Sequence, residues 1–330
     1  MPSSKPRKNS DAGDDKPSKR RRTHDFDYEK LPLGHIRILQ VTHELKRNGR
    51  RQLSAQLRSF HVDHLPQFLA LSYAWPEAGA PTRTLPCNDR HISISEHVHT
   101  ALENLVPLDA ACAFAILIDA ICIDQDNDIE KNKQVPHMGS IYSLASQVVI
   151  WVGPNEIVDQ HREQIEYLSD HSKLVPWARW QGDLERLPFS EQGDEIWFAV
   201  GSMISSRWFW RLWTVQELCL AQKVDVLCGH CCLPWDSLMV LRCKAFHVDS
   251  GNGPAPNIQC LNICRSFQDL DASKIITRLE NLRQLLVSKP VDKVYGLMFL
   301  LPKVLREKIE VDYSQENEYG SHMSNWHTSY

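Results

Sequence analysis

Apolar and polar positions alternate along this chain in two different periods, which together predict both strands and helices. Runs with period two, or wholly apolar runs, predict strands at 36–41, 68–74, 84–87, 91–94, 113–118, 147–152 and 224–228. The run at 113–118 is almost entirely apolar and stops at Asp119, as is typical of a strand covered on both faces in a parallel sheet. Asn88-Asp89-Arg90 predicts the tight turn of a hairpin.

Apolar residues at helical spacing predict helices at 96–105, 132–145, 207–221, 235–246, 275–287 and 291–301. Pro136 either lies in the first turn of the second helix or bends it. The stretch 156–192 reads as an irregular insertion. Because strands and helices alternate at βαβ lengths, the sequence predicts an open, mostly parallel α/β sheet flanked by helices, with a mainly helical C-terminal extension.

The composition shifts divide the chain into four parts. Residues 1–25 are polar and basic and predict a disordered tail, 26–235 an α/β domain, 236–314 a helical part of the same region, and 315–330 a loose tail. The sequence stops without a terminating element, which is consistent with a fragment of a longer protein. Lys19–Arg22 reads as a nuclear-import signal, a nucleic-acid arm or a solubilising tail.

The composition excludes several classes of function. The net charge is −4, so no global field attracts nucleic acid, and no apolar run reaches the length of a membrane span. Ten cysteines without a secretory leader favour a reducing compartment, so we expect a cytoplasmic protein, or a nuclear one if Lys19–Arg22 directs import. The thiols around Cys228 and Cys231 read as buried cysteines, and no metal site is predicted.

The stretch 208–218 holds three tryptophans, a phenylalanine and a single acid. On a helix, Trp210, Trp213 and Glu217 lie on neighbouring parts of one face, and Ser205 or Ser206 caps its start. An acid beside large aromatics can lie in a partly dry site, where burial changes its proton affinity. The alternative is that the aromatics are ordinary core and the acid is solvated.

Four segments occur in an order that resembles the fungal heterokaryon incompatibility (HET) domain family. They are Ala70–Trp75; Ile118–Gln125 with Glu130, Gln134, Tyr142 and Trp151–Gly153 behind it; Trp208, Arg211, Trp213 and Gln216-Glu217; and Asp292–Leu297 with Val311–Ser314. Three positions depart from the usual pattern: Pro76 replaces Gly, Asp124 replaces Asn, and Lys131 replaces Arg.

The resemblance implies a role in nonself recognition between fused fungal cells, a form of innate immunity that ends in programmed cell death. HET domains are also distantly similar to TIR domains, which have a flavodoxin-like fold. Some TIR domains cleave NAD⁺ with one Glu in a Trp-Cys-x-x-Glu-Leu pattern, which Trp213–Leu218 matches except for Thr214. By this analogy Glu217 is the candidate catalytic residue, and no cofactor is bound because NAD⁺ is the substrate.

In an open α/β sheet, ligands bind outside the carboxyl ends of the strands. This predicts that Ser72, Tyr73, Trp75 and Asp119 contact NAD⁺, with Tyr73 and Trp75 stacking on nicotinamide, and the TIR resemblance adds Trp213. The alternatives are that Trp75 is an ordinary lid on the sheet edge and that Asp119 caps the loop after its strand. We expect homotypic self-association, activation by a sensor partner, and no membrane or nucleic-acid partner. The alternative function is a non-enzymatic assembly module that triggers death through partners.

Overall fold

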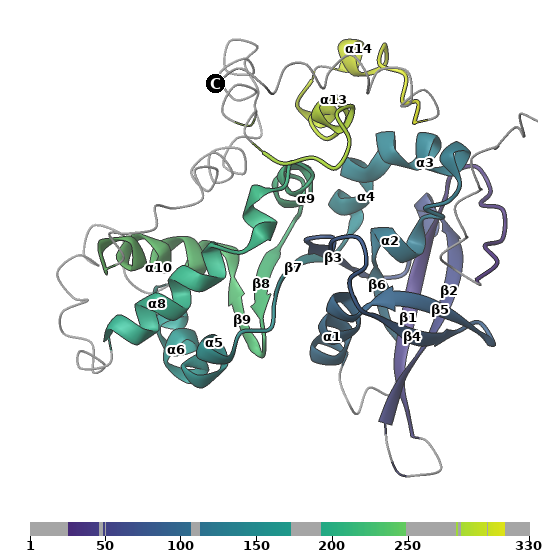
Figure 1. The fold of residues 1–330 in the computed structure, drawn as a ribbon. Helices are drawn as coiled ribbons and strands as arrows, with labels where there is room; N and C mark the ends of the chain where they lie inside the picture. The colour runs from purple at the N-terminus through teal and green to yellow at the C-terminus, as the bar shows by residue number, and fades with distance from the viewer. Residues whose placement is uncertain are drawn as a thin grey trace, which may run out of the picture.

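The computed structural model describes residues 26–45, 49, 51–106, 113–172, 193–248, 282, 285–301 and 303–313. Within these residues, nine strands form one sheet in the order β5-β4-β2-β1-β6-β3-β7-β8-β9 (Figure 1). The strands are β1 (His35–Leu45), β2 (Arg51–His61), β3 (Leu69–Tyr73), β4 (Thr82–Cys87), β5 (Arg90–Ser95), β6 (Phe114–Leu117), β7 (Gln147–Gly153), β8 (Val224–Cys228) and β9 (Cys231–Pro234).

The sheet is open and mixed. Strands β6, β3, β7 and β8 are parallel to one another and form its centre. Antiparallel pairs extend it on both sides, through β1 against β6 and β2 on one side and β9 against β8 on the other. The predicted open α/β sheet is therefore confirmed, and outside its parallel centre β2 also pairs in parallel with β4.

The described helices pack around this sheet. They are α1 (Glu96–Leu105), α2 (Asp119–Cys122), α3 (Asp128–Gln134), α4 (Met138–Leu144), α5 (Glu156–Gln160), α6 (Arg162–Ser172), α8 (Gly193–Ile204), α9 (Thr214–Cys219), α10 (Trp235–Val248), α13 (Asp292–Tyr295) and α14 (Lys303–Arg306). Helices α6, α8 and α10 gather beside the β8–β9 end (Figure 1). Trp151, Trp208 and Trp235 are among the fully buried side chains of the core.

Several predicted elements are confirmed with close boundaries. Helix α1 covers the predicted residues, and Ser95 caps it by accepting a hydrogen bond from the Val98 N–H. The predicted hairpin is β4–β5, where Asn88 and Asp89 have φ of 50° and 59°. Asn and Asp tolerate this left-handed conformation better than other non-glycine residues, which is why the turn is readable from sequence.

The predicted helix 207–221 is wrong as a continuous element. A 3-10 turn at Arg207–Trp210 is followed by an extended Arg211, with φ −87° and ψ 142°, before α9 begins. The interruption has a long-range cause, because the Leu286 N–H donates to the Trp210 carbonyl and the Leu212 N–H donates to the Leu286 carbonyl. These bonds engage backbone groups that a continuous helix would use internally.

Other predicted elements differ in detail. The helix predicted at 132–145 is divided into α3 and α4 by a 3-10 turn at Val135–His137, where Pro136 removes a backbone donor. The stretch 156–172, predicted as irregular, is helical as α5 and α6. The helix predicted at 291–301 is two short turns, α13 and a 3-10 turn at Met298–Leu300. Strands β2 and β9 were not predicted.

Some predictions fall outside the described residues. These are the tail 1–25 with Lys19–Arg22, most of the helix 275–287, and the tail 315–330. Where helices are described, none combines the length and apolar character that crossing a bilayer requires.

Candidate functional site

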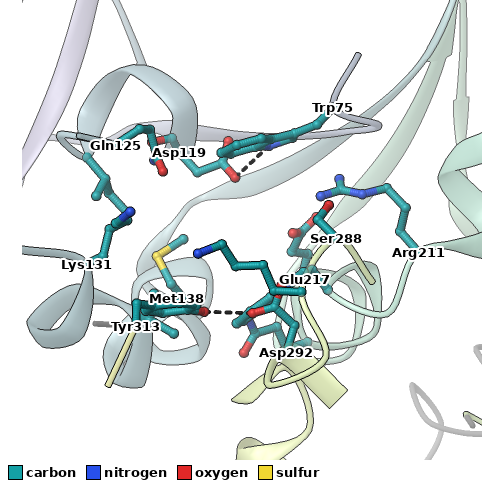
Figure 2. Close-up of a pocket in the computed structure, with 15 residues that line it drawn as sticks. Trp75, Asp119, Gln125, Lys131, Met138, Arg211, Glu217, Ser288, Asp292 and Tyr313 are labelled. Carbon is teal, nitrogen blue, oxygen red and sulfur yellow. Dashed lines mark hydrogen bonds between the residues drawn. The ribbon is translucent and has the colours of Figure 1, made fainter. Parts of the chain in front are cut away.

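A cavity of about 180 Å³ lies where the loops after β3 and β6 meet α4, α9 and the segment 285–313 (Figure 2). Trp75 follows β3 and Asp119 follows β6, so both come from the carboxyl ends of parallel strands, as predicted. Glu217 reaches the same cavity from the first turn of α9. The lining is Trp75, Asp119, Ile123, Gln125, Lys131, Val135, Met138, Arg211, Trp213, Gln216, Glu217, Ser288, Lys289, Asp292 and Tyr313.

Glu217 is held from behind by a directional pair of hydrogen bonds. The Trp208 indole N–H donates to Ser72 Oγ at 2.6 Å, and the Ser72 hydroxyl donates to Glu217 Oε2. An indole N–H can only donate, so it occupies an acceptor position of Ser72 and leaves the hydroxyl hydrogen for Glu217. Glu217 Oε2 is therefore an acceptor, which favours the carboxylate and fixes its orientation.

The pKa of Glu217 is raised to about 7. Burial is the largest cause, since Glu217 is only 5% exposed and its charged form loses hydration. The nearby Asp119 carboxylate raises this pKa further, whereas the Arg211 guanidinium and the Ser72 hydroxyl lower it. Glu217 therefore changes charge near neutral pH, where a group can act in either protonation state.

Asp119 is fixed by several donors at the opposite wall. Its carboxylate accepts the Trp75 indole N–H at 3.0 Å and the Ala120 N–H at 2.8 Å. Burial raises the pKa of Asp119, and the Arg211 guanidinium opposes that shift. The bond to Asp119 sets the plane of the Trp75 ring on the cavity wall (Figure 2).

Arg211 connects the two acids electrostatically. Its guanidinium donates to the Tyr73 carbonyl, and its charge lowers the pKa of both Glu217 and Asp119. The structure places Arg211 in the cavity lining with a backbone partner.

Helix α4 packs closely against the end of α9 at Gly139. A Cβ atom at Gly139 would lie 2.7 Å from Leu220 Cδ1, nearer than side-chain atoms normally come. A side chain at this position would therefore require the end of the Leu220 side chain to move.

The remaining wall comes from the C-terminal segment. Tyr313 donates from its hydroxyl to Asp292 Oδ1 at 2.8 Å, and Asp292 is 5% exposed (Figure 2). The Tyr313 N–H donates to Asn132 Oδ1 at 3.0 Å, which joins this segment to α3. The cavity is thus closed by residues far apart in the chain.

The structure brings together four of the six predicted site residues. Glu217, Trp75, Asp119 and Trp213 line the cavity. Ser72 is buried behind Glu217 and contacts the cavity through that residue. Tyr73, predicted to stack on nicotinamide, is 3% exposed and outside the lining, with its ring near His97.

The sequence interpretation assigned no site role to several lining residues. Asp292 and Tyr313 were recognised only as part of the family pattern, and Ser288 and Lys289 were not singled out. For Lys131 the sequence contained a signal of a site role, because the resembled family usually has another cation, Arg, at this position. The others become site residues only through the fold of the segment 285–313.

Comparisons with known proteins agree with this geometry. The sequence profile described as heterokaryon incompatibility protein (HET) matches residues 68–217. The chain carries a HET domain. The match begins just before β3 and ends at Glu217, so it contains the Trp75, Asp119 and Glu217 side of the cavity.

The chain is also similar to a curated relative, heterokaryon incompatibility protein 6, OR allele, of Neurospora crassa. The two are 29% identical over 201 residues, which covers 50% of this chain and 29% of the relative. The chain therefore spans well under two thirds of that protein. No solved structure gives a significant match.

Proposed function

We propose that this HET domain acts in heterokaryon incompatibility, as an effector of nonself recognition that leads to cell death by cleaving NAD⁺. The name of the Neurospora relative and the family match support the incompatibility role. One observation supports this reaction. Glu217, buried and with a pKa of about 7, lines a cavity that Trp75 also lines.

The reaction is hydrolysis of the bond between nicotinamide and ribose. Breaking that bond leaves positive charge on the ribose, which the Glu217 carboxylate stabilises in a site with little water. Water then adds to the ribose carbon, and its proton leaves to solvent. Nicotinamide departs neutral, so the products are nicotinamide, ADP-ribose and a proton, and no general acid is required.

The surrounding residues have positioning roles in this proposal. The Trp75 ring, fixed through Asp119, stacks on the nicotinamide, and Trp213 contributes a second aromatic wall. Ser72 orients Glu217, and Asp119 adds negative potential that favours the charged ribose. Self-association or a sensor partner would bring the domain to its active state.

The test is nicotinamide release from NAD⁺ by the purified chain, at high protein concentration to promote assembly. Glu217→Gln should lower the rate by at least about 100-fold, as expected when the main electrostatic stabiliser of a transition state is lost. Glu163→Gln, an exposed change on α6, is the matched control and should leave the rate unchanged. Equal rates in wild type and Glu217→Gln would reject the catalytic role.

A second candidate is a non-enzymatic assembly module. It is favoured by the full burial of Trp208 and Phe209, which pack against Trp235 as ordinary core and need no ligand to explain them. In this case, cell death caused by expressing the protein should persist with Glu217→Gln. Loss of killing in that variant, with folding and assembly intact, would favour the enzyme.

A further inference from the structure

The cavity has two electrically different ends. Asp119 and Glu217 lie at one end with Arg211. Arg211 lowers the pKa of both acids, and Asp119 raises the pKa of Glu217. At the other end, two lysine ammonium groups lie over the ring of Tyr313, Lys289 at 4.8 Å and Lys131 at 5.9 Å from its centroid. Figure 2 shows Lys131 beside Tyr313 and on the far side of the cavity from Arg211.

The lysine end is built by tertiary structure. Lys131 comes from α3 and Lys289 from the segment 285–313, 158 residues later in the numbering. The Tyr313 ring between them is held at its hydroxyl by Asp292 and at its backbone by Asn132, the neighbour of Lys131. Both ammonium groups therefore approach one aromatic ring that is itself held at two points.

The Lys131 side chain has a partner that an anion can displace. It is 18% exposed and pairs with Asp128, itself 51% exposed, at 2.7 Å. Because Asp128 is open to water, a more strongly charged anion can replace it beside Lys131 at small cost. Asp292 and Tyr313 at this end are about as buried as Glu217, so Lys131 and Lys289 are the partly exposed groups there.

The size of the cavity limits what can enter it. About 180 Å³ is below the usual range for pockets that enclose a drug-sized molecule, roughly 300–1,000 Å³. A cavity of this size does not enclose a whole dinucleotide, so part of one would extend out of it past the partly exposed lysines. Two ammonium groups there match the charge of a phosphate group.

We propose that Lys131 and Lys289 form a pyrophosphate subsite, which makes this cavity selective for dinucleotides over the corresponding ribosides. The subsite deepens the proposed function, since the acids act on the ribose while the lysines hold the phosphates. Asp292 lines the same end, and its carboxylate accepts the Tyr313 hydroxyl, so its charge is partly offset there. Selectivity then comes from the C-terminal segment as well as from the residues that the family profile covers.

Inorganic pyrophosphate, titrated into the full chain by calorimetry, tests the subsite without any need for turnover. Lys289→Gln and Lys131→Gln should each weaken binding by about tenfold, the loss expected for one charge-assisted hydrogen bond. Lys133→Gln, an exposed change on the same helix as Lys131, is the matched control and should bind as wild type does. Added salt should weaken binding in the wild type.

The proposal is overturned if wild type fails to bind pyrophosphate, or if the cavity variants bind as tightly as Lys133→Gln. A kinetic experiment with NAD⁺ and nicotinamide riboside tests the substrate selectivity. Both lysine variants should raise KM for NAD⁺ by about tenfold and leave cleavage of nicotinamide riboside unchanged, because the riboside has no phosphate. Pyrophosphate binding without any NAD⁺ cleavage would reject the proposed reaction and leave the phosphate subsite standing.

Discussion

Two glutamates of this domain are equally inaccessible but differ in what surrounds them. Glu130 is 8% exposed and accepts hydrogen bonds from the two terminal guanidinium nitrogens of Arg37, at 2.5 and 3.0 Å, and from the Asp124 N–H. Glu217 is 5% exposed, accepts the Ser72 hydroxyl and faces a cavity. Burial alone therefore does not identify a functional acid.

The difference lies in how the negative charge is compensated. The Arg37 guanidinium also donates to the Cys122 and Glu29 carbonyls, so Glu130 belongs to a closed network that fixes the loop after α2. Glu217 has a cation nearby, Arg211, whose guanidinium donates to the Tyr73 carbonyl. The first acid stabilises the fold, and the second is left with an unbalanced charge beside an open space.

The largest expected effect is the loss of stability when Glu130, the acid paired with Arg37, is replaced. Glu130→Gln leaves the Arg37 charge buried without its counter-charge, and the free energy of unfolding should fall by about 3–5 kcal/mol. Chemical denaturation with urea measures this loss. Glu163→Gln on the surface should change stability by less than about 0.5 kcal/mol. A loss below about 1 kcal/mol for Glu130→Gln would mean that the Arg37 network is not structural.

Glu217, the proposed catalytic acid, should respond in the opposite direction. Because its folded pKa is about 7 and its ordinary value is 4.5, the folded state binds a proton more tightly than the unfolded state. This stabilisation is complete below pH 4.5 and is lost as the pH rises through about 7. The Glu217→Gln variant has no titrating carboxyl at this position, so it does not lose this stabilisation as the pH rises. The free energy of unfolding of the variant, relative to that of wild type, should therefore rise by about 3 kcal/mol between pH 4.5 and pH 8.

Denaturant unfolding of both proteins at several pH values makes this measurement. Asp119 is present in both proteins, and its own titration cancels to a first approximation in the difference. A stability difference that does not change with pH would show that Glu217 is hydrated and ionised throughout.

The smallest expected effect concerns the hydroxyl behind Glu217. Ser72→Ala removes a donor that favours the carboxylate, so the pKa of Glu217 should move further upward, by about one unit. A carbon-13 NMR titration of the carboxyl reads this shift independently of activity. Ser146→Ala removes a hydroxyl that is bonded to the Phe68 carbonyl and should leave the titration unchanged. A downward shift in Ser72→Ala would contradict the direction of that hydrogen bond.

The parts of the fold that the sequence predicts are those with local causes. The apolar runs of β6 and β7 are readable because strands covered on both faces contain few polar residues. Strand β2 alternates Leu53, Ala55 and Leu57 inward, a signal that was present and was missed. The break before α9 has no local signal, because it depends on hydrogen bonds to Leu286.

The same distinction applies to the site. Trp75 and Asp119 were predicted because each follows a recognisable strand of the parallel sheet. Glu217 was predicted from the resemblance of Trp213–Leu218 to the TIR pattern, and the structure places all three in one cavity. The Ser72 hydroxyl was placed near the ligand, yet its contact with Glu217 spans 145 positions. Lys289 and Tyr313 enter the cavity through the path of the C-terminal segment, which periodicity does not determine.

The division of the cavity between two distant stretches of chain has a genetic consequence. The stretch that ends at Glu217 encodes one wall, and the segment 285–313 encodes the other. A recombination event between them exchanges one wall and preserves the other intact. Under the proposed function, alleles that differ in this way would share Asp119 and Glu217 and differ in the residues that meet the ligand from the other wall.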